Sequence, residues 1–179
     1  MLSSSSIKIE TPRLYLHPLS YEQLQQYLRL DFSLEDGLGL ERYERIIAPA
    51  LMEAFHESIL PAAAKAKDDL LYVTLWTIIV KEKKRMVGDM CFKGGPNEAG
   101  EIEIGYGTYP DFCCNGFMTE AVSAIIKWAF QQPGVNYIVA ETDDDNFASQ
   151  KILLRNNFMQ QKQIDKMLRW RLDNLSTKP

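Results

Sequence analysis

The feature that most constrains the fold of this chain is a change of pattern near residue 109. Before it, three strand-like runs lie at 70–80, 86–92 and 101–109, and only the turn-forming segments KEKKR and GGPNEAG separate them. β-Branched and aromatic residues favour strands, and turns this short join neighbouring strands in an antiparallel arrangement. Residues 70–109 are therefore predicted to form a three-stranded antiparallel meander.

After residue 109 the chain alternates between helical and strand-like patterns. Residues 116–131 carry apolar side chains on one helical face, and Pro133-Gly134 ends that helix. A strand over 137–141 and a helix over 146–156 follow, and Asn157 suits the end of this helix because asparagine tolerates a positive φ. The last predicted elements are the two strands of a hairpin, at 158–163 and 167–172. Strands and helices mixed in this order predict an α+β fold.

The first third of the chain is predicted to be mainly helical. Residues 6–17 alternate as an edge strand that Pro12 interrupts. Ser20 and Gln23 have the spacing of a capping box, which predicts a helix that ends near Asp31. The further expectations are a loop at 33–39, a helix over 40–60 that Pro49 kinks or divides, and a short helix that begins at Pro61. Helices this early in the chain are expected to form a lid beside the sheet.

Length and charge narrow the class of protein. The 179 residues fit a single domain over 1–179, with 1–6 loosely held. A net charge of −4 argues against nucleic acid or an anionic membrane as the main partner. The N-terminus lacks the features of a signal peptide, and the apolar stretch Leu70–Val80 is too short to span a bilayer. The sequence therefore predicts a cytoplasmic protein.

The cysteines suggest neither a disulfide framework nor a metal site. Cys91, Cys113 and Cys114 are three in number, two of them adjacent, and no His lies near them in the sequence. The expectation is a reduced protein with no metal.

The most informative segment for function is the connection between the strand that ends at Thr108 and the helix that begins near Gly116. The N-terminus of a helix presents unpaired N–H groups and a partial positive charge, which together bind phosphate. Gly116 lets the backbone approach a ligand closely, and Thr119 adds a hydroxyl donor. From spacing alone, an ordinary strand-to-helix connection is the favoured interpretation, since a single Gly at a helix start is common. The segment lacks the GxxxxGK[ST] and GxGxxG patterns, which argues against an ATP or dinucleotide loop.

Four segments, taken together, resemble the GNAT acetyltransferase superfamily. Its acetyl-CoA signature, Arg or Gln, two residues, Gly, one residue, then Gly or Ala, falls on Cys113, Gly116 and Met118, so that only the glycine matches. The following Thr119-Glu120-Ala121 resembles the branch of ribosomal-protein N-terminal acetyltransferases. The three other similar segments are TPRLYLHPL (11–19) for its opening, EIGYGTYP (103–110) for its fourth strand and NFASQKILLRNNF (146–158) for its second signature.

The resemblance implies a fold and a cofactor. The fold is a mixed, mostly antiparallel central sheet with a splayed fourth strand and flanking helices. The reaction is transfer of an acetyl group from acetyl-CoA to a primary amine, on a protein N-terminus or a small molecule, and a homodimer is compatible with it. The implied cofactor-binding residues are Thr108, Asn115, Gly116, Phe117, Met118, Thr119 and Asn146.

Acetyl transfer to an amine requires a base for the ammonium proton and an acid for the departing thiolate. Glu103 matches the acidic residue of the family's fourth strand and is the preferred base. Glu101, two residues earlier on the same face, is its rival, and both can equally be solvated strand residues. Ser149 aligns with a serine that serves as the acid in some relatives, although Asn146 and Ser149 also fit a helix cap and its first turn.

Other residues offer groups for the same chemistry. Many relatives use a tyrosine acid at positions that here hold Leu153 and Leu154, and Tyr106 and Tyr109 are alternatives, with Tyr106 expected in the core. His17 and His56 are expected to be structural. The unusual signature and the absent tyrosine support an alternative hypothesis, in which the chain is a non-catalytic acyl-CoA-binding or interaction protein on the same fold.

Overall fold

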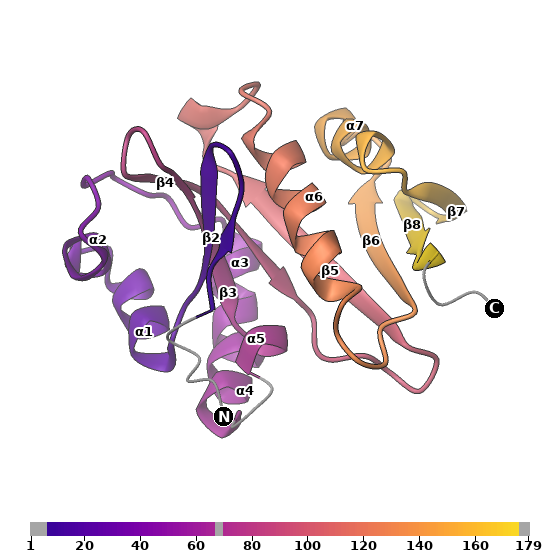
Figure 1. The fold of residues 1–179 in the computed structure, drawn as a ribbon, viewed down its shortest axis with the longest axis horizontal. Coiled ribbons are helices and arrows are strands. Elements are labelled where there is room, and N and C mark those ends of the chain that lie inside the picture. Colours follow the sequence, from indigo (N-terminus) through magenta and orange to yellow (C-terminus); the bar gives the residue numbers. More distant parts are fainter. Residues whose placement is uncertain (1–6, 67–69, 176–179) are drawn as a thin grey trace.

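The computed structural model describes residues 7–66 and 70–175, so the expectation about residues 1–6 lies outside the described part. Eight strands form one sheet in the order β1-β2-β3-β4-β5-β6-β8-β7 (Figure 1). The strands are β1 (Ile9–Glu10), β2 (Leu14–Pro18), β3 (Leu75–Val80), β4 (Arg85–Phe92), β5 (Glu101–Thr108), β6 (Tyr137–Asp143), β7 (Met159–Ile164) and β8 (Met167–Asp173). The helices are α1 (Tyr21–Arg29), α2 (Ser33–Leu38), α3 (Pro49–Ala54), α4 (Leu60–Lys65), α5 (Leu70–Val73), α6 (Phe117–Ala129) and α7 (Phe147–Arg155), with a π-helical turn η2 (Phe55–Ile59) and a 3₁₀ turn η3 (Pro110–Phe112).

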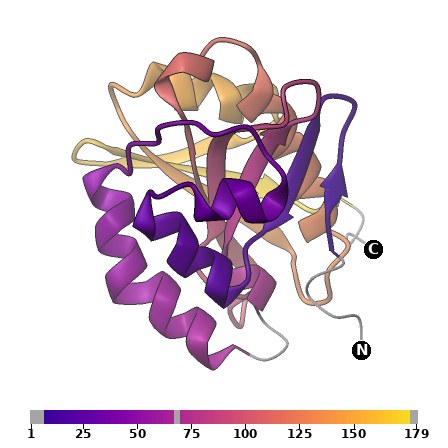
Figure 2. The ribbon, with the colours of Figure 1, turned by 90° about the vertical axis from the view of Figure 1, so that its left-hand side faces the viewer.

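Helices cover the two faces of the sheet unequally. α6 and α7 lie on the face that is turned to the viewer in Figure 1, and α1 to α4 lie together over the other face, beside the first strands (Figure 2). Side chains alternate along a strand, and Trp76 of β3 packs against Trp128 of α6, with ring centroids 5.2 Å apart and the rings tilted by 57°. Its neighbour Thr77 faces the other way, and both are fully buried. The expected helical lid beside the sheet is therefore present.

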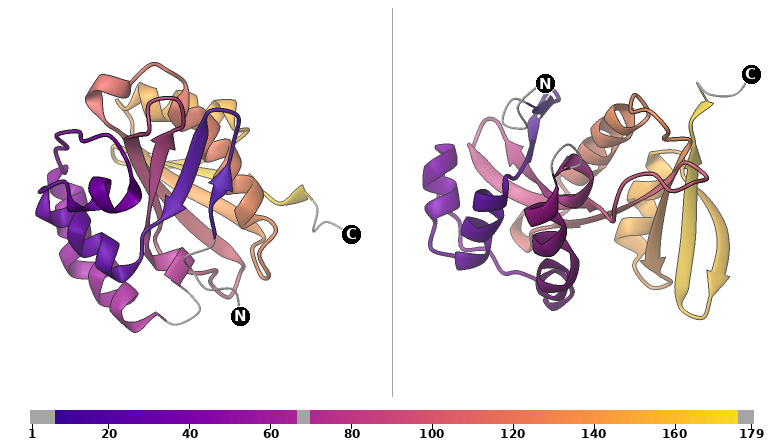
Figure 3. Two further views of the ribbon diagram at one scale, coloured as in Figure 1. Left: turned by 60° about the vertical axis from the view of Figure 1, so that its left-hand side comes forward. Right: turned by 90° about the horizontal axis from the view of Figure 1, so that it is seen from below.

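The sheet divides in its middle. β4 and β5 pair antiparallel along the run from Gly88↔Thr108 to Phe92↔Ile104. β5 and β6 run parallel and pair only over 101–103 and 137–139. Beyond Glu103 the two strands diverge, as the right-hand view of Figure 3 lets the reader follow. We call the space between the later part of β5 and the later part of β6 the wedge.

Several local predictions are confirmed. The meander β3-β4-β5 and the hairpin β7-β8 are antiparallel as expected. Ser20 caps α1 by accepting from Gln23 N at 3.2 Å, and the Gln23 side chain accepts from Ser20 N at 2.9 Å. Asn157 has φ +63° after α7. Short-range chemistry alone dictates these features, which is why the sequence predicts them.

The predicted loop at 33–39 was wrong, because this segment contains the helix α2. Phe32 and Gly39, both in the left-handed region, flank it on either side. Asp31 accepts from Ser33 N at 3.0 Å and so fixes the entry into the helix. The glycine that suggested a loop, Gly39, is the helix C-cap.

The helix predicted over 40–60 was also wrong in its first half. Residues 40–48 are not helical, and Pro49 begins α3 instead of dividing a longer helix, which suits a residue that has no N–H to donate. Arg45 is the buried residue of residues 40–48, and its ion pair with Glu35 of α2 anchors the segment. Ile46, which was assigned to the apolar face of the predicted helix, is 85% exposed.

Two boundaries also differ from the prediction. Pro61 does not begin a separate helix, because α3, η2 and α4 follow one another without a break. Leu60 N donates to Phe55 O, an i→i−5 bond that widens the turn just before the proline. The strand expected from residue 70 begins at Leu75, since Leu70–Val73 forms the short helix α5, whose Tyr72 packs on Trp128.

The last strand in the sheet order, β7, is an exposed edge. All six of its residues are exposed, and its pairing with β8 shifts register between Gln160 and Lys162.

Within residues 7–66 and 70–175, none of the helices has the length and apolar character that a membrane span requires.

Candidate functional site

The N-terminus of α6 opens beside the end of β5. Gly116 is the N-cap with φ +74°, a conformation that glycine adopts without strain. The N–H groups of Phe117, Met118 and Thr119 belong to the first turn, where an α-helix offers no internal acceptor. With the helix dipole, these three groups form an anion-binding position.

The two signature residues that depart from the family pattern make contacts within the fold. The Met118 side chain is 4% exposed and points toward Gly88 of β4. Cys113 is exposed, and its Sγ donates to Tyr109 O at 3.7 Å. Between them, Asn115 holds the loop closed, because its side-chain amide donates to Phe112 O at 3.1 Å and to Cys113 O at 3.0 Å.

Residues 11–13, distant in sequence, form hydrogen bonds with the first turns of α6. Arg13 Nε donates to Glu120 Oε2 at 2.6 Å, and Thr11 Oγ1 donates to Glu120 Oε1 at 2.6 Å. Burial pushes the pKa of Glu120 upward, but the hydrogen bonds from Thr11 and Arg13 outweigh it and lower that pKa. Sequence reasoning missed this contact, although both ends of it, TPRL and TEA, stood in the segments that resemble the family.

A groove of about 790 Å³ runs along the outer side of α6. It reaches from the N-terminus of the helix past Lys127, with the turn before β2 on one side and the end of α7 on the other. Its cationic lining residues are Arg13, Lys127 and Arg155. The groove is thus continuous with the anion-binding turn.

On the face of α6 and α7, two hydroxyl groups bridge the wedge. Ser149 Oγ of α7 donates to Tyr106 Oη of β5 at 2.9 Å, and Tyr106 Oη donates to Ser149 O at 3.3 Å. Burial raises the pKa of Tyr106 to about 12. Asn146 is the N-cap of α7 and accepts from Ser149 N at 3.1 Å. Tyr106 is therefore not merely a core residue, and it lies against the predicted acid.

On the opposite face, charged side chains border the wedge. Glu103 forms an ion pair with Lys93. Glu101 pairs with Arg169 of β8 at 2.7 Å, and Arg169 also contacts Glu141 of β6 at 3.4 Å. The two rival bases are thus side by side on one face, as the sequence predicted, but they have different partners.

Beyond Glu103 the same face of β5 carries only glycines. A Cβ built on Gly107 would meet no atom within 4 Å, and one on Gly105 would meet only the Cys91 sulfur, at 3.7 Å. The backbone of β5 is therefore not screened by side chains of its own on this face.

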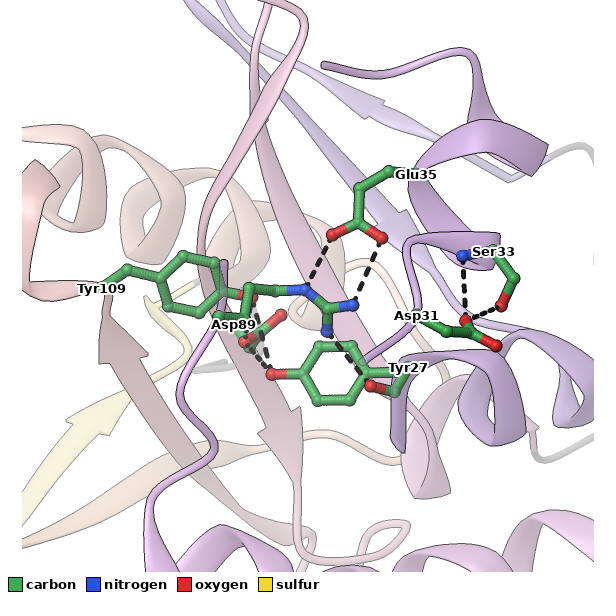
Figure 4. A network of polar contacts seen from close by, with 7 residues as sticks. Tyr27, Asp31, Ser33, Glu35, Asp89 and Tyr109 are labelled. Carbon is green, nitrogen blue, oxygen red and sulfur yellow. Dashed lines mark hydrogen bonds and ion pairs between the residues drawn. The ribbon is translucent and has the colours of Figure 1, made fainter. Parts of the chain in front are cut away.

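A buried polar cluster lies on this same face of the sheet, because Asp89 of β4 is paired with Gly107 of β5 (Figure 4). Asp89 of β4 accepts from Tyr27 Oη at 2.7 Å and from Tyr109 Oη at 2.8 Å. Burial raises the pKa of Asp89 to about 6, although the tyrosine hydroxyls lower it. Arg45 pairs with Glu35 at 2.9 Å beside it.

The cluster fixes the first residue of the loop between β5 and α6. Tyr109 directly follows β5, and its ring stacks on Tyr43 with centroids 6.0 Å apart. Its hydroxyl is committed to Asp89, on the face opposite Ser149, so the structure does not place Tyr109 with the predicted acid. Sequence reasoning missed Asp89 because a single Asp in a strand gives no periodic signal.

The remaining candidates lie apart from the wedge. His17 contacts Gln23 at 3.4 Å, and burial lowers its pKa. Leu153 is fully buried and Leu154 is 57% exposed, so these positions supply no hydroxyl. Across the described ranges, no three His, Cys, Asp or Glu side chains are grouped so that they could hold a metal ion.

Comparisons with known proteins agree with this geometry. Over 84 residues the chain is 37% identical to the uncharacterized N-acetyltransferase YjdG of Bacillus subtilis (strain 168), an alignment that covers 47% of this chain and 50% of that protein. It is 30% identical over 86 residues to the uncharacterized N-acetyltransferase YoaA of the same organism, with 48% and 49% covered. The chain thus spans about half the length of these curated relatives.

Solved structures share the whole fold at low identity. RimL, a ribosomal L7/L12 alpha-N-protein acetyltransferase in complex with coenzyme A, superposes with a TM-score of 0.64 at 14% identity, over 93% of this chain and 98% of that chain. The ribosomal-protein-S5-alanine acetyltransferase of Vibrio fischeri gives 0.65 at 15% identity, over 97% and 100%. The model of the acetyltransferase (GNAT) domain matches residues 13–159. Since this match covers most of the chain, the protein belongs to the GNAT acetyltransferase family.

Proposed function

We propose that this protein transfers an acetyl group from acetyl-CoA to a primary amine by direct attack in a ternary complex. One observation carries the proposal: the wedge between β5 and β6 lies next to the first turn of α6. An anion-binding turn at the mouth of a narrow gap suits a ligand with a diphosphate and a long uncharged arm. Coenzyme A is such a ligand, and the RimL structure holds it in the same fold.

The residues present fit the cofactor. The N–H groups of Phe117, Met118 and Thr119 would receive the diphosphate, and Gly116 lets it come close to the backbone. These contacts need no particular side chain, so Met118 is no obstacle to them.

Three polar residues would hold the arm of the cofactor along the wedge. Thr108 ends β5 beside Gly88, Asn146 stands at the start of α7, and Asn115 keeps the loop between β5 and α6 in shape. Their side chains would lie along the path from the anion-binding turn to the hydroxyl pair.

Acetyl-CoA supplies the activated thioester, and the chain supplies the proton transfers. Glu103 is the proposed base that takes the proton from the acceptor ammonium. Ser149 is the proposed acid toward the leaving sulfur, and its bond to Tyr106 fixes its position at 2.9 Å. The two groups lie on opposite faces of β5, so that the attacking amine and the leaving thiolate of the tetrahedral intermediate would each have a separate proton-transfer group.

The acceptor would arrive on the face of Gly105 and Gly107, where no side chain of β5 stands in its way. The names of RimL and of the Vibrio fischeri neighbour refer to protein N-termini. A protein N-terminus and a small-molecule amine are therefore the two acceptor classes to compare.

The test is an assay of free-thiol release from acetyl-CoA with a panel of N-terminal peptides and small amines. The proposal expects release that depends on both acetyl-CoA and one class of amine. Calorimetric titration with acetyl-CoA accompanies it. Uptake of acetyl-CoA without turnover on any amine would instead identify a non-catalytic binding protein, and no uptake would contradict the proposed cofactor.

A further inference from the structure

We propose that Arg13, in the turn between β1 and β2, is a cofactor-positioning residue that supplies the cation at the diphosphate turn. The inference rests on the proposed function. Residues 109–119, which form that turn, include neither Lys nor Arg. A diphosphate bound there would have only main-chain N–H groups, the dipole of α6 and whatever cation the fold brings from elsewhere.

The fold brings Arg13 to this place. Its Nη1 donates to Asn115 O at 3.1 Å. Its Nη2 would lie 3.6 Å from a Cβ built on Gly116. The guanidinium carbon lies 4.9 Å from the ring centroid of Phe117. The charged group therefore touches three successive residues at the point where the helix begins.

The guanidinium is also held in one orientation. Glu120 accepts from Arg13 Nε at 2.6 Å and from Arg13 N at 3.1 Å, and Thr11 fixes the carboxylate in turn. A long side chain that is already ordered loses little conformational freedom when a ligand binds.

The position is accessible to a ligand. The Arg13 side chain is 48% exposed, and it lines the groove along α6 together with Gly116 and Thr119. Glu120 engages the Nε side of the guanidinium, so the Nη2 side is the one nearest to Gly116. Charge-assisted donors in a fixed fork match phosphate oxygens.

A purely structural role is the competing explanation, since Arg13 ties the β1–β2 turn to α6. The two roles differ in what the cofactor must contain. A structural clamp affects every substrate equally, whereas a diphosphate contact matters only when the phosphates are present.

The experiment compares Arg13→Gln and Arg13→Lys with the wild-type protein, with CoA and pantetheine as ligands in calorimetry. In parallel, thiol release is measured with acetyl-CoA and with S-acetylpantetheine, which has no diphosphate. Arg13→Gln is expected to weaken CoA binding about tenfold or more, and Arg13→Lys to recover part of it. Turnover of S-acetylpantetheine is expected to stay within about twofold of wild type.

A further variant serves as the control. Arg42→Gln removes an exposed arginine that pairs with Asp36 away from the groove, and it should have no effect on either ligand.

Equal CoA affinity in Arg13→Gln and wild type, or equal losses with and without the diphosphate, would overturn the role of Arg13 while leaving the proposed function intact. If Arg13→Gln does not fold, Arg13→Lys decides the matter by the same comparison. Failure of the wild-type protein to bind CoA at all would overturn both proposals together.

Discussion

Glu101 and Glu103 lie two residues apart on one face of β5, yet their surroundings give them different suitability as a base. Arg169 holds Glu101 in a network with Glu141, at 2.7 and 3.4 Å. Glu103 forms an ion pair with Lys93, whose side chain is 57% exposed, and it stands where β5 leaves β6. A lysine on a flexible stem can move aside more easily than an arginine fixed by two carboxylates.

We therefore expect Glu103→Gln to lower kcat about 100-fold or more, because the ammonium of the acceptor would lose its base. Thiol release measured from pH 6 to 10 is the readout. Glu101→Gln is the matched control and should change kcat by less than about fivefold. Full activity of Glu103→Gln across this pH range would show that the base is another group.

The raised pKa of Asp89 implies that the free energy of unfolding depends on pH. Its pKa is about 6 in the folded protein against 3.8 ordinarily. A carboxyl whose folded pKa is raised stabilises the fold most below pH 4, and this contribution is lost as the pH rises through 6. Burying the ionised form thus costs about 3 kcal/mol at neutral pH, since one pKa unit corresponds to about 1.4 kcal/mol.

Asp89→Asn should therefore gain stability relative to wild type as the pH rises from 4 to 7, by up to about 3 kcal/mol. Its side-chain oxygen can still accept from Tyr27 and Tyr109. Urea unfolding of both proteins at several pH values checks this. Asp36→Asn, which removes an exposed partner of Arg42, should show no such gain, and a pH-independent difference for Asp89→Asn would contradict the argument.

Among the elements, the packing of β4 on β5 depends on a glycine. A Cβ on Gly88 would lie 2.5 Å from Gly107 O and 3.1 Å from the Thr108 Cα, both backbone atoms that cannot move aside without separating the strands. Because Gly88 has no side chain, the end of β5 and the Met118 side chain of α6 can both lie close to β4.

Gly88→Ala is accordingly expected to lower the free energy of unfolding by more than about 2 kcal/mol, as overpacking of a well-packed core does. Gly105→Ala is the matched control, since its Cβ would meet only the Cys91 sulfur at 3.7 Å. Chemical denaturation of both variants measures the difference. Equal effects of the two changes would contradict this account.

How far the sequence predicts the fold depends on whether the determinants are local. The capping box at Ser20 and the turns of the meander are decided within a few residues, and they were predicted correctly. The conformation of segment 40–48 was predicted wrongly, because it depends on the buried ion pair of Arg45 with Glu35, which only the folded chain brings together.

The same distinction holds for the candidate site. Glu103, Gly116 and Ser149 stand in segments that resemble the family, and the sequence identified them as candidates. Arg13, Tyr106 and Asp89 owe their relevance to contacts across the fold, at separations of 107, 43 and 62 residues. No local pattern predicts such contacts.

At the scale of the whole molecule, the two parts of the sheet share few backbone bonds beyond Glu103, and side chains join them instead. Ligand binding in the wedge should therefore stabilise the fold as a whole. At about 100 times its Kd, CoA should add about 2.7 kcal/mol, which corresponds to a rise in Tm of roughly 5–11 °C for a protein of this size. Differential scanning fluorimetry measures this shift, with NADH at the same concentration as control, and an unchanged Tm would contradict CoA binding.

The exposed strand β7 also determines how molecules of this protein can meet. The register shift at Gln161 makes β7 irregular, which disfavours hydrogen bonding to a strand of another copy. Pairing there would also require desolvation of the exposed Lys162. Extension of the sheet into a neighbour is thereby disfavoured. A homodimer is therefore expected to assemble through a different surface.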